Sequence, residues 1–327
     1  MLDSDTKLRI LRSMITARAL EERLIMMSKS ADGFFWIGGP GEEAFNTCLG
    51  VLARPGATLD HDFFHFHYRN SATMVAMGMD PLDAIRQMAV RVTDPFTGGR
   101  NFCGHYCRRQ WNVVPVTSTI QTQSAVATGT ARAQKRHGGT GITITTSGDA
   151  GTAEGDFTIG LNWSTQPGWE LPILYIVTNN KYGISTRYSE VHGHSRVADI
   201  AAGFGIESHV VDGNDVSASY EVIASAMQVV RNERRPVLIE AFVSRLHGHS
   251  SSSGGNRVPE GAEVDPLSRY AEQLLGEGLI ESAQFDSWLD QERQRMGDFL
   301  QQAKNEPHPA PESIYDHIFA TTEPSKC

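Results

Sequence analysis

Between residues 121 and 246, short apolar runs alternate with longer segments of helical periodicity, and this alternation constrains the fold more than any other feature. The run 171–180 is short, nearly all apolar and bounded by turn residues, as a buried parallel strand is. Strands that alternate with helices predict an α/β fold with a doubly wound parallel sheet flanked by helices. The expected strands are 141–147, 171–180, 209–213 and 236–246, and the expected helices are 121–137, a helix from the glycine-rich turn at 148–156 to about residue 163, 196–204 and 215–234.

Helical segments are also expected on both sides of this alternating region. Apolar residues recur there at helical spacing, and an Asp-Pro pair marks two of the expected helix starts. The expected flanking helices are 3–29, 41–53, one that starts at Asp80-Pro81, and a charged helical region from Asp265-Pro266 to about 303. We therefore expect one α/β domain over residues 1–262, which includes an N-terminal helical arm, and a helical C-terminal extension over 263–327.

The composition disfavours several classes of partner. The chain has 38 Asp and Glu against 29 Lys and Arg, and its net charge of −9 disfavours binding to nucleic acid or to an anionic membrane. No stretch approaches the ~20 apolar residues of a membrane helix, and the N-terminus lacks the apolar core of a secretory signal. We therefore expect a cytoplasmic protein that binds neither nucleic acid nor membrane.

The four cysteines are too few and too scattered for a disulfide framework, so reduced thiols are expected. Cys103 and Cys107 are close enough in sequence to suggest a zinc site. A structural zinc site needs four ligands, however, and no matching second pair is present. Free thiols are therefore the preferred interpretation.

Polar clusters follow three of the expected strands, at 147–151, 178–182 and 247–250. In open α/β sheets, ligands bind beyond the carboxyl ends of the strands. The first cluster also contains small residues, which let a backbone approach a phosphate closely, and it precedes a helix whose N-terminus favours an anion. The sequence therefore predicts a ligand site at this edge of the sheet.

Asp149 and Asn180 are the metal-ligand candidates in these clusters. A carboxylate beside a phosphate repels it unless a divalent cation lies between them, and an amide oxygen from the next strand end adds a neutral ligand. Such oxygen ligands, with phosphate oxygens, suit Mg²⁺. Taken singly, each residue is better explained as an Asp helix cap or an Asn turn. The pair at consecutive strand ends favours the metal site.

Longer motifs in this order carry a family resemblance. They are GDAGTAEGDF from residue 148, TNNKYGIST from 178, AAGFGIESHVVDGNDVSASYEVI from 201 and RPVLIEAFVSRLHGHSSS from 235, with GEEAFNTCLGVLARPG, HYRNSATMVAMGMDP and TSTIQTQSAVATG upstream. Together they resemble the alpha subunit of the decarboxylating component of 2-oxoacid dehydrogenase complexes, and the resemblance covers roughly residues 5–320. The stretch 102–122 looks closer to the branched-chain branch than to the pyruvate branch.

The resemblance implies a thiamine diphosphate-binding fold of the diphosphate-binding type, with thiamine diphosphate and Mg²⁺ as cofactors. His249 matches a catalytic histidine of a loop over the cofactor, and Phe35 matches an aromatic residue near the substrate's acyl side. Asp149, Asn180 and the carbonyl of Tyr182 match the metal ligands. The residues that match cofactor-binding positions are His67, Tyr68, Arg69, Ser118, Ile120, Gly148, Asp149, Ala150, Gly151, Asn180 and His249.

The resemblance also implies an activity and partners. The activity is the oxidative decarboxylation of a 2-oxoacid, with a branched chain favoured, followed by acyl transfer to a lipoyl domain. In this family a separate beta subunit supplies the glutamate that protonates the cofactor's pyrimidine, so a two-alpha, two-beta heterotetramer is expected. The other expected partners are a lipoyl-bearing acyltransferase and a small 2-oxoacid substrate.

The sequence departs from the family pattern in four respects. One is the spacing of 31 positions from Asp149 to Asn180, which is slightly longer than usual. The other three are changes of residue type. Ala150 replaces the usual third glycine, Ser71 stands where histidine is common, and Ser251–Gly255 replaces acidic residues after His249. These changes leave open an acetoin dehydrogenase or another thiamine diphosphate-dependent acyl or aldehyde transfer, and also a non-catalytic assembly or regulatory subunit.

Three alternating histidines allow a second interpretation. On a strand, His61, His65 and His67 would share one face, as a metal cluster needs. We favour a cofactor-lining loop because the adjacent Tyr68-Arg69 pair matches the family.

Overall fold

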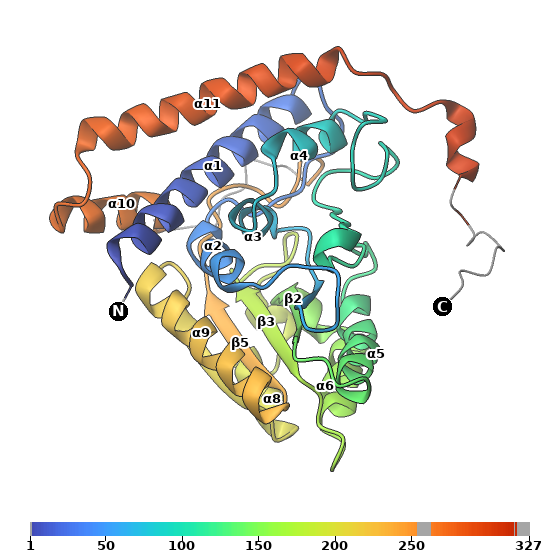
Figure 1. The fold of residues 1–327 in the computed structure, drawn as a ribbon. Coiled ribbons are helices and arrows are strands. Elements are labelled where there is room, and N and C mark those ends of the chain that lie inside the picture. The colour runs from blue at the N-terminus through green and yellow to red at the C-terminus, as the bar shows by residue number, and fades with distance from the viewer. Residues whose placement is uncertain (1, 254–262, 317, 319–327) are drawn as a thin grey trace.

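A five-stranded parallel sheet lies at the centre of the protein, with strand order β1-β2-β3-β5-β4 (Figure 1). The computed structural model describes residues 2–253, 263–316 and 318. The strands are β1 (Phe63–His65), β2 (Thr143–Gly148), β3 (Ile173–Asn179), β4 (Glu207–Asp212) and β5 (Val237–Phe242). All neighbouring pairs are parallel. The predicted α/β fold with a parallel sheet is confirmed.

Both faces of the sheet are covered, because side chains of β3 alternate between two hydrophobic clusters. Ile173, Tyr175 and Val177 pack with one set of helices, and Leu174 and Ile176 belong to the larger core on the other face. The first set includes α5 (Thr122–Arg136), α6 (Gly155–Ser164) and α8 (Val197–Gly203). The helices of the opposite face include α2 (Glu43–Leu52) and α9 (Val216–Glu233). The sheet is therefore doubly wound, as predicted.

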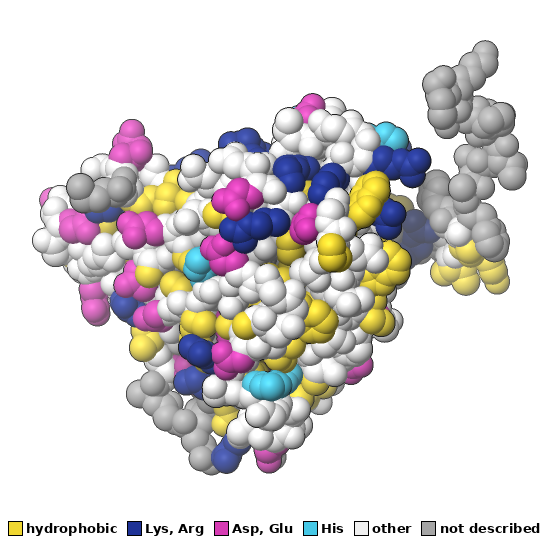
Figure 2. Space-filling model, turned by 90° about the horizontal axis from the view of Figure 1, so that it is seen from below, with side chains coloured by type: hydrophobic (Ala, Val, Ile, Leu, Met, Phe, Trp, Pro, Cys, Tyr) yellow, Lys and Arg dark blue, Asp and Glu magenta, His cyan; other side chains and the backbone are white. Residues whose placement is uncertain are grey.

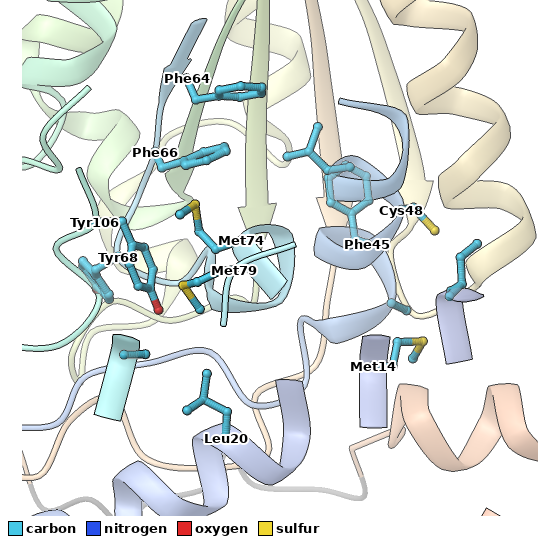
Figure 3. Packing of buried hydrophobic residues seen from close by; sticks show 14 of the residues in the cluster. Met14, Leu20, Phe45, Cys48, Phe64, Phe66, Tyr68, Met74, Met79 and Tyr106 are labelled. Carbon is cyan, nitrogen blue, oxygen red and sulfur yellow. The ribbon is translucent and has the colours of Figure 1, made fainter. Parts of the chain in front are cut away.

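The N-terminal helix contributes to the main core. Helix α1 (Ser4–Ser28) begins where the side chain of Asp3 accepts the backbone N–H of Thr6 at 2.7 Å. Figure 3 shows Met14 and Leu20 of α1 in the same buried cluster as Phe45 and Cys48 of α2. Burial of these side chains joins the helical arm to the sheet.

The C-terminal helices pack back onto the N-terminal arm. Helix α10 (Pro266–Gly276) begins at Asp265, which also forms a bidentate pair with Arg18 at 2.9 Å. Helix α11 (Ser282–Lys304) then runs beside α1, and it also contacts α4 (Pro81–Met88) (Figure 1). The predicted boundary between domains 1–262 and 263–327 adjoins 254–262, which lies outside the described residues. The division stays a prediction.

Some short elements were not expected from the sequence. They are α3 (Ser71–Ala76), α7 (Tyr188–Val191) and the 3-10 turns Arg109–Trp111, Ala150–Ala153 and Pro311–Tyr315. Each spans too few residues for helical periodicity to be visible.

The surface carries charges of both signs. Figure 2 shows acidic and basic side chains interspersed around hydrophobic patches on one face. Among the helices of the described part of the chain, none combines the length and apolarity needed to cross a bilayer.

Candidate active site

The carboxyl ends of the strands bring the predicted polar clusters together. Gly148 pairs in register with Thr178, and Asn179 pairs with Phe242, so β2, β3 and β5 end at the same level. A pocket of about 370 Å³ lies at this edge of the sheet. The predicted residues that line it are Phe35, His67, Tyr68, Arg69, Ser118, Ile120, Gly148, Asp149, Ala150, Gly151, Tyr182 and His249. Strand topology therefore gathers segments that are more than a hundred residues apart in the sequence.

Asp149 is fully buried, and neither of its carboxylate oxygens has a hydrogen-bond partner among the described residues. Although it precedes the 3-10 turn Ala150–Ala153, its side chain makes no capping hydrogen bond. The helix-cap alternative is therefore wrong. Burial raises the pKa of Asp149 to about 7, and the nearby charge of Arg69 opposes this shift. A buried carboxylate with free lone pairs is suited to a hard divalent cation.

Asn180 is buried and, unlike most of the predicted site residues, does not line the pocket. Its amide oxygen accepts the backbone N–H of Tyr182 at 3.1 Å, so the Asn-turn alternative holds for this oxygen in the structure. Lys181 has a left-handed backbone, with φ of 67°, and reverses the chain so that Tyr182 reaches the pocket. The Asn180 oxygen retains a second lone pair for a metal.

Arg245 was not singled out in the sequence, yet it supports this loop. Its guanidinium donates to the carbonyl of Gly183 at 2.8 Å and to that of Ile184 at 3.2 Å. Gly183 and Ile184 both line the pocket. A lone arginine three residues after a strand carries no local signal, because its partners lie 62 and 61 residues upstream in the chain.

Arg69 contributes a positively charged side chain to the pocket. Its side chain is buried, and its Nε lies 3.6 Å from Oε1 of Glu42, a buried carboxylate that the sequence analysis missed. Burial raises the pKa of Glu42, and Arg69 opposes that shift. A Cβ on Gly148 would lie 2.8 Å from Nη1 of Arg69, so glycine leaves room for the guanidinium. Arg69 can bind a phosphate with charge-assisted hydrogen bonds.

Gly151 and Ile120 form a second close contact in the pocket. A Cβ added to Gly151 would meet Cγ2 of Ile120 at 2.6 Å. Ile120 precedes Gln121, which has a left-handed backbone with φ of 71° and turns the chain just before α5 begins. The small residue at 151 therefore lets the Ile120 side chain enter the pocket. Ser118, two residues before Ile120, shares a hydrogen bond of 2.7 Å between its hydroxyl and Nε2 of His105.

His249 is placed by two residues that the sequence also predicted. Its Nδ1 lies 3.4 Å from Nη2 of Arg69, and its Nε2 lies 3.3 Å from the hydroxyl of Tyr68. Because a guanidinium only donates, Nδ1 accepts and the proton of the neutral ring is on Nε2. Burial first, and then the charges of Arg69 and Arg245, lower the pKa of His249 to about 3. The imidazole is therefore neutral at physiological pH.

We expect the pKa of His249 to rise when an anion occupies the pocket, because the anion offsets the charge of Arg69. NMR titration of the imidazole should give a pKa below 5 in the free protein and a value at least one unit higher with Mg²⁺ and pyrophosphate. The imidazole signals of His209, on edge strand β4, serve as the internal control. An unchanged His249 titration would contradict the proximity of the bound anion.

The three alternating histidines do not form a cluster. His61 contacts Thr58 at 2.8 Å, His65 contacts Thr130 at 3.0 Å, and His67 turns into the pocket. No group of three metal-binding side chains occurs within residues 2–253, 263–316 and 318. Only His67 fits the cofactor-lining interpretation, and its buried Nδ1 has no hydrogen-bond partner among the described residues.

The cysteines and the serine-rich loop complete the account of the predicted features. Cys48, Cys103 and Cys107 are free, as expected, and Cys327 lies outside the described residues. The backbone N–H of Ser251 donates to the carbonyl of Trp36 at 2.9 Å, which joins the loop after His249 to the loop before α2. Gly254 and Gly255 lie outside the described residues.

The pocket fits the cofactor and metal that the resemblance implies. The buried Asp149 carboxylate has no hydrogen-bond partner among the residues that the structure describes, which suits a cation. Arg69 and the small residues Gly148, Ala150 and Gly151 border the same space and suit a phosphate.

Comparisons with known proteins agree on one family. Residues 11–312 match the family model for "Dehydrogenase E1 component". The chain is 30% identical over 315 residues to 2-oxoisovalerate dehydrogenase subunit alpha of Bacillus subtilis, covering 94% of each chain. It is 28% identical over 326 residues to the mitochondrial 2-oxoisovalerate dehydrogenase subunit alpha of Homo sapiens, covering 97% of this chain and 71% of the human one. The chain therefore belongs to the dehydrogenase E1 component family, and the resemblance to its alpha subunits is confirmed.

Proposed function

We propose that the protein is the alpha subunit of a thiamine diphosphate- and Mg²⁺-dependent oxidoreductase that decarboxylates a branched-chain 2-oxoacid. The observation that carries this proposal is the fully buried Asp149 carboxylate, which has no hydrogen-bond partner among the described residues and faces the same pocket as Arg69. The substrate class is supported by the names of the relatives from Bacillus subtilis and Homo sapiens, both 2-oxoisovalerate dehydrogenase alpha subunits.

The metal ion, the diphosphate and the middle of the cofactor would each contact different residues. Asp149, Asn180 and the carbonyl of Tyr182 would hold Mg²⁺, and Arg69 would bind the diphosphate beside the glycine-rich turn. Bound there, thiamine diphosphate would supply the carbanion stabilisation that protein side chains lack. Ile120 would pack against the middle of the cofactor, because Gly151 leaves space for it.

His249 would act on the substrate side of the pocket. In the structure its Nε2–H is directed at the Tyr68 hydroxyl, and its Nδ1 accepts from Arg69. A neutral imidazole in this position can donate a hydrogen bond to a substrate oxygen or hold a proton near neutral pH. Phe35, which lines the same pocket, would contact the acyl group.

The proposed partners follow from the family. A beta subunit would complete the active site in a two-alpha, two-beta heterotetramer, and a lipoyl-bearing acyltransferase would accept the acyl group. The relatives' names identify them as alpha subunits, which supports a beta partner. We also propose a cytoplasmic location, which the free thiols of Cys48, Cys103 and Cys107 support.

The experiment measures CO₂ release by the protein purified with its beta subunit. We expect turnover of 2-oxoisovalerate that requires both Mg²⁺ and thiamine diphosphate, with acyl transfer to an added lipoyl domain. Pyruvate and acetoin are tested in the same assay. A strong preference for acetoin would replace the proposal with acetoin cleavage, and calorimetry that detects no cofactor binding would indicate a non-catalytic subunit.

A further inference from the structure

A second cavity of about 200 Å³ lies next to the candidate active site. Two aromatic residues, Phe35 and Phe102, line both this cavity and the first pocket. They therefore form a partition between the two spaces. The remaining residues that line the second cavity are Phe34, Gln87, Met88, Val90, Gly99, Arg100, Asn101 and Cys103.

The two rings of this partition are held in place. Their centroids lie 5.1 Å apart with an interplanar angle of 89°, an edge-to-face contact that stabilises their relative orientation. The Cys103 thiol lies 3.4 Å from the carbonyl of Phe35. The ring of Phe102 also lies 4.1 Å from the ring of His105, which lines the first pocket and is hydrogen-bonded there to Ser118.

The chemistry of the second cavity differs from that of the first pocket. The first pocket contains Asp149, Arg69 and His249, which suit charged groups. Three polar side chains line the second cavity, and each is hydrogen-bonded to nearby backbone: Gln87, Arg100 and Asn101. The apolar part of the lining includes the buried Met88 and the exposed Phe34. These side chains suit an aliphatic or aromatic chain that extends away from the charged end of a substrate.

We propose that Phe102 sets the upper limit on the side-chain length of the 2-oxoacid, and that the second cavity is the space that Phe102 closes to longer chains. This inference rests on the proposed function. Short branched chains would contact Phe35 and Phe102 on the near side of the partition. A longer chain would collide with the Phe102 ring, because its contacts with the Phe35 edge and with the ring of the hydrogen-bonded His105 restrict its movement.

The test compares the wild type with Phe102→Ala and Phe102→Leu, each as the complex with the beta subunit. The measured quantity is kcat/KM for straight-chain 2-oxoacids of increasing length and for 2-oxoisovalerate. Phe34→Ala is the matched control, since Phe34 lines the second cavity but not the pocket. Calorimetry measures the binding of the corresponding 2-hydroxyacids, which carry a hydroxyl group in place of the reactive 2-oxo group.

In the wild type we expect kcat/KM to fall steeply beyond a certain chain length. Phe102→Ala should raise kcat/KM about tenfold for the chains beyond that length and lower it for 2-oxoisovalerate, mainly through KM, since one methylene in an apolar pocket changes discrimination by about 10-fold or more. Phe102→Leu should give an intermediate profile, and Phe34→Ala should leave the profile unchanged. The 2-hydroxyacid affinities should follow the same order.

Two outcomes would overturn different statements. A wild-type complex that turns over no 2-oxoacid contradicts the proposed function. An active wild-type complex whose length profile and 2-hydroxyacid affinities are the same in Phe102→Ala contradicts the role of Phe102 alone. Thermal unfolding of each variant establishes that the half-buried position tolerates the change.

Discussion

Replacing Asp149 with asparagine is expected to lower the Mg²⁺-dependent affinity for thiamine diphosphate at least 100-fold. The carboxylate is fully buried, and neither of its oxygens has a hydrogen-bond partner among the described residues, which suits a bound cation. Asparagine keeps the shape of the side chain but removes the charge that attracts the metal. Calorimetry with thiamine diphosphate at fixed Mg²⁺ concentration measures this loss, and turnover by the complex with the beta subunit should fall with it.

The same substitution should stabilise the free protein at alkaline pH. The folded-state pKa of about 7 lies above the ordinary value of 3.8, so between these values the folded state binds a proton that the unfolded state does not. The free energy of unfolding of the wild type therefore falls as pH rises from about 4 to about 7, and the penalty is complete above that window. Asp149→Asn lacks this penalty and should be more stable by about 2 kcal/mol at pH 8, with little difference at pH 4.

The matched control for both effects is Asp156→Asn. Asp156 lies in the first turn of α6 and does not line the pocket. This variant should bind the cofactor as the wild type does. If Asp149→Asn binds cofactor normally in the presence of Mg²⁺, the metal-ligand assignment is wrong. If its urea unfolding shows no pH-dependent gain, the raised pKa of Asp149 is wrong.

Removing Arg69 should have two separable consequences. Arg69→Met leaves Glu42 as a buried carboxylate without its cation, and this should destabilise the fold by about 3 kcal/mol. The cofactor affinity should also fall about 100-fold, because a charge-assisted contact with the diphosphate contributes up to about 3 kcal/mol. Urea unfolding and calorimetry measure the two consequences independently.

A second substitution distinguishes the structural effect from the binding effect. Glu42→Gln removes the unpaired charge, so the Arg69→Met/Glu42→Gln double variant should recover most of the lost stability. It should not recover cofactor affinity, since the diphosphate still lacks its cation. Glu42→Gln alone should bind nearly normally. Recovery of wild-type affinity in the double variant would show that Arg69 acts only by neutralising Glu42.

Local sequence patterns were sufficient to predict many of the helices and strands. The run 171–180 predicted β3 because a strand buried on both faces is continuously apolar, and 215–234 predicted α9 because eighteen helical residues display their period clearly. The six residues of α3 are too few to do so. Similarly, β1 has three residues, and its pairing with β2 depends on contacts 80 positions away.

The same distinction applies to the candidate site, where residues with a local sequence signal were predicted and residues without one were missed. Asp149 was predicted from its place in a polar cluster at a strand end, and Arg69 was predicted from the family resemblance of the motif that contains it. Glu42 and Arg245 were missed, since each acts on a pocket residue through a contact between segments distant in sequence. The same holds for Phe102, whose position in the partition depends on Phe35 and His105.

The amino-acid sequence by itself determined the alternation of strands and helices, and with it the edge of the sheet at which a ligand would bind. It also determined which residue types would gather there, because motifs at strand ends are read along the chain. Only the tertiary structure decided that β5 lies between β3 and β4, that His67 alone of three histidines enters the pocket, and that Asp149 is buried without a partner in the described part of the chain. Burial, hydrogen-bond partners and pKa depend on which distant segments pack together, and that information is not present in local periodicity.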